Sequence, residues 1–302
     1  MKMNDAPKER HQSVEYQYRV SGHNMIITLP SGKIAKHAPE KELKCYQELY
    51  DQNSELIKFC APFYGYYTLL TKESSPVSSS LSFTPSSISS SDIDPNEPLL
   101  QNTPPGRYLV LADLNATYEY PCILDMKLGT RTYWDGAPPE KVERHLRVCK
   151  NTTSGPLGIR ICGMRTYQPK LNLRVVKDKE FGKKLTDRTL LGALALFFYD
   201  GFTFRNDIID SVMTKLYDLL EAVKRSHWRF WSSSILFTYE GNGTNKADVH
   251  LIDFGNCNFS GKYDTPDDGC ILALSNLLAY LQLIRNGVVK KVDVEKLITK
   301  DS

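Results

Sequence analysis

Residues 121–129 read Pro-Cys-Ile-Leu-Asp-Met-Lys-Leu-Gly, and this stretch guides the interpretation of the whole chain. In an extended segment, side chains two positions apart project to the same face. Asp125 and Lys127 therefore present a hydrogen-bond acceptor and a cation to one space. Pro121 fixes its own φ, and Gly129 permits the close approach of another group. This arrangement suits a ligand that carries both hydroxyl and phosphate groups.

The composition is that of an ordinary soluble protein, with 41% hydrophobic and 24% charged residues. The net charge of +3 is too small to indicate a nucleic-acid partner, and we expect none. The seven cysteines are odd in number and form no CxxC pair, which favours reduced thiols in the cytoplasm, the nucleus or both. The polar start of the chain has no signal-peptide pattern, and no run of about 18 apolar residues occurs. We therefore expect no membrane insertion.

The alternation of strand-like and helix-like segments predicts an α+β protein of two lobes. We expect a disordered tail at 1–15, an N-lobe at 16–112, a C-lobe at 113–290 and a second tail at 291–302. Within the N-lobe, residues 73–105 are rich in serine and proline and cannot bury enough apolar surface to offset their ordering entropy. We interpret them as a disordered insertion. A cleft between two lobes is a favoured ligand site.

A second motif is Leu251-Ile252-Asp253-Phe254-Gly255-Asn256. An aspartate at the end of an apolar strand, followed by Phe-Gly, is typical of the carboxylate with which kinases hold Mg²⁺. Three residues taken alone describe a turn at a strand end equally well. The His-Arg-Asp loop, the glycine-rich phosphate loop and the Walker A sequence are all absent, so we do not expect an ordinary protein kinase.

A basic helix is predicted at about residues 138–150. It carries Lys141, Arg144, His145 and Arg147 within two turns, and the first three share a face at helical spacing. A basic helix in isolation more often exposes a solvated face. A polyanionic ligand, however, needs several cations at once, because each phosphate makes charge-assisted hydrogen bonds.

Together these motifs resemble the inositol polyphosphate kinase family. The family signature Pro-x-x-x-Asp-x-Lys-x-Gly is matched at residues 121–129. Ser233-Ser234-Ile235-Leu236 is similar to the family's Ser-Ser-Leu-Leu element, and Ile252-Asp253-Phe254 to its Ile-Asp-Phe. The inositol hexakisphosphate kinase branch is resembled most, through residues 128–131, 157–164 and 229–234. The multikinase branch shares many of these positions.

The resemblance implies a two-lobed, protein-kinase-like fold with ATP in the inter-lobe cleft and Mg²⁺ as cofactor. Lys36, paired with Glu42, would contact the nucleotide phosphates. Ala112, Asp113 and Leu114 would form the hinge that holds adenine by its backbone; relatives often have glutamate at the position of Ala112.

The resemblance also assigns roles to the two motifs. Asp125 would bind the ATP ribose, Lys127 the transferred or acceptor phosphate, and Asp253 the metal, and these three are the expected catalytic residues. The expected substrate-binding residues share a polar or basic side chain near the signature: Lys127, Arg131, Lys141, Arg144, His145, Arg147 and Asn256. Asn256 stands where relatives often carry histidine, so a cationic contact there is in doubt.

Three functions remain open on the sequence. The first is an ATP-dependent kinase that forms a pyrophosphate on inositol hexakisphosphate. The second is a multikinase or trisphosphate kinase that phosphorylates a ring hydroxyl. The third is a non-catalytic binder of inositol phosphates or phosphoinositides, against which the set of Lys36, Asp125, Lys127 and Asp253 argues. We expect a monomer whose small-molecule partner is an inositol polyphosphate.

Overall fold

The computed structural model describes residues 16–22, 24–69 and 103–298, which form two compact units. Unit 1 contains residues 16–17, 24–38, 63–69 and 103–113, and unit 2 contains 18–22, 39–62 and 114–298. The predicted tail 1–15 and most of the predicted insertion 73–105 lie outside the described residues. Residues 39–62, which we assigned to the N-lobe, cluster with unit 2 instead.

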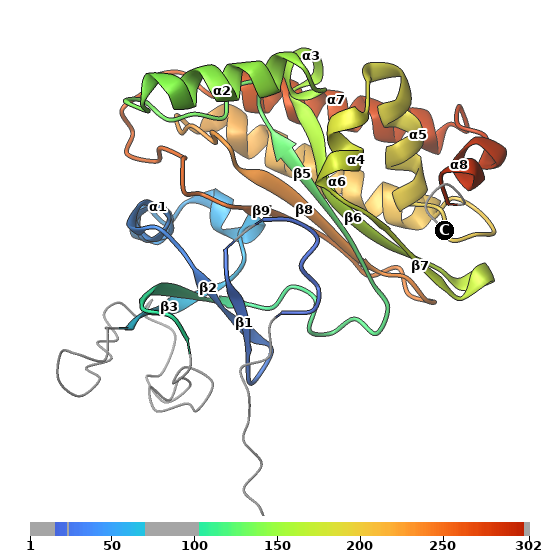
Figure 1. Cartoon of the computed structure of the whole chain (residues 1–302), viewed down its shortest axis with the longest axis horizontal. Coiled ribbons are helices and arrows are strands. Elements are labelled where there is room, and N and C mark those ends of the chain that lie inside the picture. Colours follow the sequence, from blue (N-terminus) through green and yellow to red (C-terminus); the bar gives the residue numbers. More distant parts are fainter. Residues whose placement is uncertain (1–15, 23, 70–102, 299–302) are drawn as a thin grey trace, which may run out of the picture. The chain divides into compact units, whose positions relative to one another are not determined.

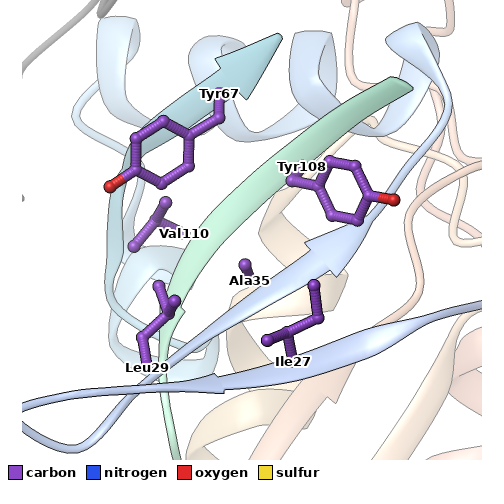
Figure 2. Packing of buried hydrophobic residues seen from close by; sticks show 6 residues of the cluster. All are labelled: Ile27, Leu29, Ala35, Tyr67, Tyr108 and Val110. Atoms are coloured by element: carbon purple, nitrogen blue, oxygen red, sulfur yellow. The ribbon is translucent and has the colours of Figure 1, made fainter. Parts of the chain in front are cut away.

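Unit 1 is built on a four-stranded antiparallel sheet in the order β1-β2-β4-β3. Its strands are β1 (Ile26–Leu29), β2 (Lys33–His37), β3 (Phe63–Leu69) and β4 (Gly106–Ala112). One face of the sheet carries the apolar cluster shown in Figure 2, made of Ile27, Leu29, Ala35, Tyr67, Tyr108 and Val110. Along β1 and β3 buried residues alternate with partly exposed ones, and this alternation helps to fix the register, because a slip by one residue would turn the cluster to the other face.

Unit 2 contains a five-stranded antiparallel sheet in the order β7-β6-β5-β8-β9. The strands are β5 (Pro121–Leu128), β6 (Ile159–Gln168), β7 (Leu173–Lys177), β8 (Ser234–Glu240) and β9 (Ala247–Ile252). The signature stretch forms β5, the central strand, and every residue of β5 except Lys127 is buried. Burial on both faces explains why this segment is almost continuously apolar.

Helices make up the rest of unit 2, and Figure 1 shows α5, α6 and α7 grouped beside the sheet. The α-helices are α1 (Glu40–Asp51), α2 (Pro139–Lys150), α3 (Ser154–Leu157), α4 (Lys179–Lys184), α5 (Asp187–Phe197), α6 (Asn206–Arg225), α7 (Asp268–Arg285) and α8 (Lys291–Ile298), and the 3-10 turns are η1 (Glu55–Phe59) and η4 (Pro169–Leu171). Side-chain caps open several of them, including α5 and α7. Thr186 and Thr189 form a capping box at α5, and Asp267 accepts a hydrogen bond from the Cys270 amide at α7.

Part of the predicted second tail forms a helix. Lys291–Ile298 forms helix α8, in which Val294 is fully buried and Glu295 accepts a hydrogen bond of 2.7 Å from the Tyr199 hydroxyl. A short helix with few apolar residues gives a weak periodic signal, and its packing partner lies almost a hundred positions away. Within the described ranges, none of the helices combines the length and apolarity needed to span a bilayer.

Candidate active site

The centre of the candidate site is a row of side chains across the sheet of unit 2. Lys127 on β5 lies directly opposite Arg160 of β6 on one side and Ser234 of β8 on the other. Opposite residues in antiparallel strands project to the same face, with their Cβ atoms about 4.5–5.5 Å apart. Asp125, two positions before Lys127 on the same strand, faces the same way. The predicted acceptor and cation therefore lie together.

Asp125 is an unusually buried carboxylate, with 2% of its surface exposed. Its Oδ2 accepts a hydrogen bond from the Ser21 hydroxyl, whereas Oδ1 is buried and accepts none from the described residues. Burial raises the pKa of Asp125; Lys127 opposes this shift, and Asp253 adds to it. Asp125 is thus a stronger base than a surface aspartate and has one acceptor oxygen unused.

A β-bulge shapes the strand beside Asp125. Asp125 pairs with Gly163, but the next residue, Met126, pairs with Ile161. The extra residue is Cys162, which lies close enough to Asp125 and Lys127 for their charges to affect the pKa of its thiol. Bulges of this kind redirect side chains beside functional sites. Gly163 also allows the backbone at Val20 to pack directly against β6, because a Cβ at position 163 would overlap the Val20 carbonyl oxygen.

Lys127 is held by three groups. Its Nζ donates to the Ser232 carbonyl oxygen and, over 3.1 Å, to the Ser234 hydroxyl. Nζ also lies 3.7 Å from Asp253 Oδ2. The side chain keeps 17% of its surface exposed, so the ammonium group is fixed in direction and still reachable by a ligand.

Asp253 follows β9 in a left-handed backbone conformation, with φ of +67°. This conformation is uncommon for a residue other than glycine and is tolerated best by aspartate and asparagine. The electrostatic coupling of Asp253 with buried Asp125 means that two like charges face one space. A divalent cation would relieve their repulsion, and Mg²⁺ is usually held by one or two carboxylates together with substrate phosphates. No cluster of three or more His, Cys, Asp or Glu with metal-site geometry occurs in the described residues.

Helix α2 presents its predicted basic residues unevenly. Lys141 lies 3.8 Å from the ring centre of Trp134, and His145 Nδ1 lies 2.7 Å from the Thr132 hydroxyl. Burial, followed by the neighbouring Arg144, lowers the pKa of both Lys141 and His145. The lowered pKa favours the neutral form of His145, which offers a hydrogen bond rather than a charge.

The other predicted substrate residues divide into free and engaged side chains. Arg144 is exposed and has no ion pair or hydrogen bond with the described residues. Arg147 points to solvent and pairs with Glu143 over 3.2 Å. Asn256 donates to the Thr132 carbonyl oxygen over 3.5 Å. Of the predicted cations on α2, Lys141, Arg144 and Arg147, Arg144 is thus the most available.

Arg131 is also engaged. Its guanidinium lies 3.8 Å from the ring centre of Trp231 and pairs with Asp135 over 2.6 Å. Hydrogen bonds from Tyr263, Arg131 and Lys262 hold the pKa of Asp135 far below its usual value. Because Asp135 already neutralises Arg131, a role of Arg131 in phosphate binding stays a prediction without geometric support.

The nucleotide residues predicted in unit 1 lie on and after its strands. Lys36 is on β2 opposite Leu109 of β4, and Ala112 ends β4. The Asp113 amide donates to the Gly32 carbonyl oxygen over 2.8 Å, and its carboxylate accepts from the Tyr16 hydroxyl over 2.6 Å. Leu114 and Glu42 belong to unit 2. The pairing of Lys36 with Glu42 and the hinge contacts stay predictions.

Two cations near the site were missed by the sequence analysis. Lys41 of α1 lies 5.6 Å from the ring centre of Trp134 and donates to the Asn256 carbonyl oxygen over 3.5 Å. Arg160, opposite Lys127, is 94% buried, since 6% of its surface is exposed. Nothing in the local sequence distinguishes either residue, because only the strand register and the chain path bring them to the site.

A comparison with protein families identifies the group. The model for "Inositol polyphosphate kinase" matches residues 108–282, more than half of the chain. The chain belongs to the inositol polyphosphate kinase family. The match includes the signature strand, helix α2 and Asp253, so it covers the site of unit 2 described above.

Curated members of the family are similar to a part of this chain. Inositol hexakisphosphate kinase 3 of Mus musculus is 36% identical over 204 residues, covering 60% of this chain and 52% of its own length. Inositol hexakisphosphate kinase 2 of the same species is 37% identical over 136 residues, covering 45% of this chain and 30% of its own. The chain therefore spans about half the length, or less, of these relatives.

A solved structure supports the fold. The inositol phosphate multikinase Ipk2 of S. cerevisiae, in complex with ADP and Mn²⁺, has a TM-score of 0.65 to this structure at 24% identity. The similarity covers 83% of this chain and 98% of that one. The mixed α+β architecture predicted from the sequence is thus the fold of this kinase family.

Proposed function

We propose that this family member is an ATP-dependent kinase of inositol polyphosphates, and that it forms a pyrophosphate on inositol hexakisphosphate. The observation that carries the proposal is Lys127, whose ammonium is fixed 3.7 Å from Asp253 and faces the same way as Asp125. Membership of the kinase family and the similarity to hexakisphosphate kinases support the same assignment.

The chemistry of phosphoryl transfer asks mainly for positioning and for neutralisation of charge. Asp253 would hold Mg²⁺, which supplies charge neutralisation on the nucleotide phosphates. Lys127 would contact the transferred phosphoryl group, with its direction fixed by the Ser232 carbonyl and Ser234 hydroxyl oxygens. Lys141, Arg144 and Lys41 would attract the polyanionic acceptor.

A second candidate is phosphorylation of a ring hydroxyl, and one observation favours it. A hydroxyl acceptor must lose a proton, whereas a phosphate acceptor is already an anion. Burial raises the pKa of Asp125, and its Oδ1 has no hydrogen-bond partner among the described residues. Such a carboxylate is suited to accept a proton from a hydroxyl group.

The test compares acceptors directly. The protein is incubated with Mg·ATP and either inositol hexakisphosphate or inositol trisphosphate, and the products are separated by charge. A product more highly charged than hexakisphosphate supports pyrophosphate formation. A product from trisphosphate alone supports the hydroxyl kinase. Binding of either compound without any product would leave a non-catalytic binder and refute the kinase assignment.

A further inference from the structure

Arg160 is a buried cation without a counter-ion among the described residues. It lies at the start of β6 with 6% of its surface exposed. Its Nε and Nη1 atoms are buried, and among the described residues they have no hydrogen-bond acceptor and the side chain has no aspartate or glutamate in an ion pair with it. Arginine remains cationic in proteins, so this group cannot escape the cost of burial by losing a proton.

No carboxylate of the described residues pairs with Arg160, and several other cations lie near it. Lys127 stands directly opposite on β5. His145 of α2 is close enough for Arg160 to contribute to lowering its pKa, after burial, Arg144 and Lys141. Cys162, the bulged residue on β6, also lies within the field of Arg160. The cations of β5, β6 and α2 therefore converge on one region.

The backbone holds Arg160 in this position. Gly158, in a left-handed conformation with φ of +69°, ends α3 and leads into β6. A Cβ at Gly158 would lie 3.2 Å from Ala273 of α7, so the strand starts in tight contact with the core. The Gly158 carbonyl oxygen accepts a hydrogen bond of 2.8 Å from the amide of Gly129, the last residue of the signature. The fold thus fixes Arg160 beside the signature strand.

A buried, unpaired guanidinium in a basic region is explained if an anion completes it. The planar fork of arginine matches the oxygen atoms of phosphate and makes two parallel hydrogen bonds. Because opposite residues on paired strands have Cβ atoms about 5 Å apart, Arg160 and Lys127 can contact the same phosphate or two adjacent ones.

We propose that Arg160 binds a non-transferred phosphate of the inositol polyphosphate, next to the group that Lys127 contacts, and so selects highly phosphorylated substrates. This inference rests on the proposed function. In inositol hexakisphosphate every ring position beside the acceptor carries a phosphate, whereas a trisphosphate leaves half of the ring positions as hydroxyl groups. Only the fully phosphorylated ring always offers Arg160 its anion.

The test is Arg160→Met, with Arg188→Met of α5 as the matched control, because Arg188 is exposed and has no side-chain partner among the described residues. Calorimetry measures binding of inositol hexakisphosphate and of inositol trisphosphate without nucleotide or metal, and thermal unfolding is followed with and without each compound. We expect hexakisphosphate affinity to fall about tenfold to a hundredfold, as for loss of a charge-assisted bidentate contact. The loss of trisphosphate affinity, expressed as a fold-change, should be at least about three times smaller than the loss of hexakisphosphate affinity.

The unliganded protein distinguishes a binding role from a structural one. Removing an uncompensated buried charge should leave the Tm of unliganded Arg160→Met at or above that of the wild type. A lower Tm with unchanged hexakisphosphate affinity would make Arg160 structural and overturn the proposal. If Arg160→Met does not fold, Arg160→Lys keeps the charge but loses the fork, and wild-type affinity in that variant would equally overturn it.

The outcomes separate this inference from the proposed function. A wild-type protein that binds hexakisphosphate through Arg160 but transfers no phosphate refutes the kinase assignment and keeps the inference. A wild-type protein that transfers phosphate, with unchanged affinity in Arg160→Met, refutes the inference alone. Equal losses for hexakisphosphate and trisphosphate would remove the selectivity and overturn the proposal as stated.

Discussion

Replacing Asp253 by asparagine should abolish turnover with little effect on folding. Asp253 has a φ of +67°, and asparagine tolerates this left-handed conformation as well as aspartate does. The substitution therefore keeps the backbone and the size of the side chain. It removes one negative charge, which lies 3.7 Å from the Lys127 ammonium and adds to the raised pKa of Asp125.

The expected effects on stability and catalysis differ in size. At 3.7 Å, Coulomb's law with an effective dielectric constant of about 20 gives an attraction of about 4.5 kcal/mol. The Asp253 side chain is 35% exposed, and water screening reduces the net contribution of the pair to about 1 kcal/mol. The Tm should fall by no more than about 4 °C. If Asp253 holds the metal as proposed, loss of its carboxylate should cost about 4 kcal/mol or more in the transition state, or at least about a thousandfold in kcat.

The assay measures phosphate transfer from Mg·ATP to inositol hexakisphosphate, alongside calorimetric binding of the same compound without nucleotide. Binding should persist or strengthen, since a negative charge near a polyanion has been removed. Asp248→Asn is the matched control. Asp248 lies on β9, its side chain is 44% exposed, and it forms an ion pair of 2.7 Å with Lys215. Wild-type turnover in Asp253→Asn, or an equal loss in Asp248→Asn, would refute the assignment of Asp253.

Three further predictions test neighbouring features. Lys127→Ala should raise the apparent KM and lower kcat together, and an unchanged kcat would argue against contact with the transferred phosphate. Burial, with neighbouring cations, lowers the pKa of His145 in the folded protein. The contribution of neutral His145 to stability is therefore lost as pH falls from about 6.5, the pKa in the unfolded chain, through the lower pKa of the folded protein. The free energy of unfolding of His145→Gln should therefore depend less on pH in this window; an equal slope would contradict the shift. Gly163→Ala should displace residues 18–22 through overlap with Val20 and speed trypsin cleavage there, whereas Gly192→Ala, which meets nothing within 4 Å, should not.

Local rules were enough to predict the elements that carry the site. The run at residues 121–128 is buried on both faces and forms β5, and period-2 geometry put Asp125 and Lys127 on one face. The basic helix predicted at 138–150 is α2, which spans Pro139–Lys150. These features depend on neighbours within a few positions. The order of strands in the sheet depends on the pairing of β5 with β8, two segments more than a hundred positions apart, and periodicity contains no information on that pairing.

The contrast between two arginines shows where charge counting along the chain fails. Arg131 adjoins the signature and was predicted to bind substrate, yet Asp135 and the Trp231 ring already satisfy it. Arg160 lay in a stretch used only for its resemblance, yet the register β5–β6 brings it opposite Lys127 without a counter-ion among the described residues. A cation contributes to anion binding only in so far as the fold leaves its charge uncompensated, and compensation is a property of tertiary neighbours. If Arg160→Met weakens hexakisphosphate binding more than removal of Arg131 does, burial without a partner is a better guide to this site than proximity to the motif.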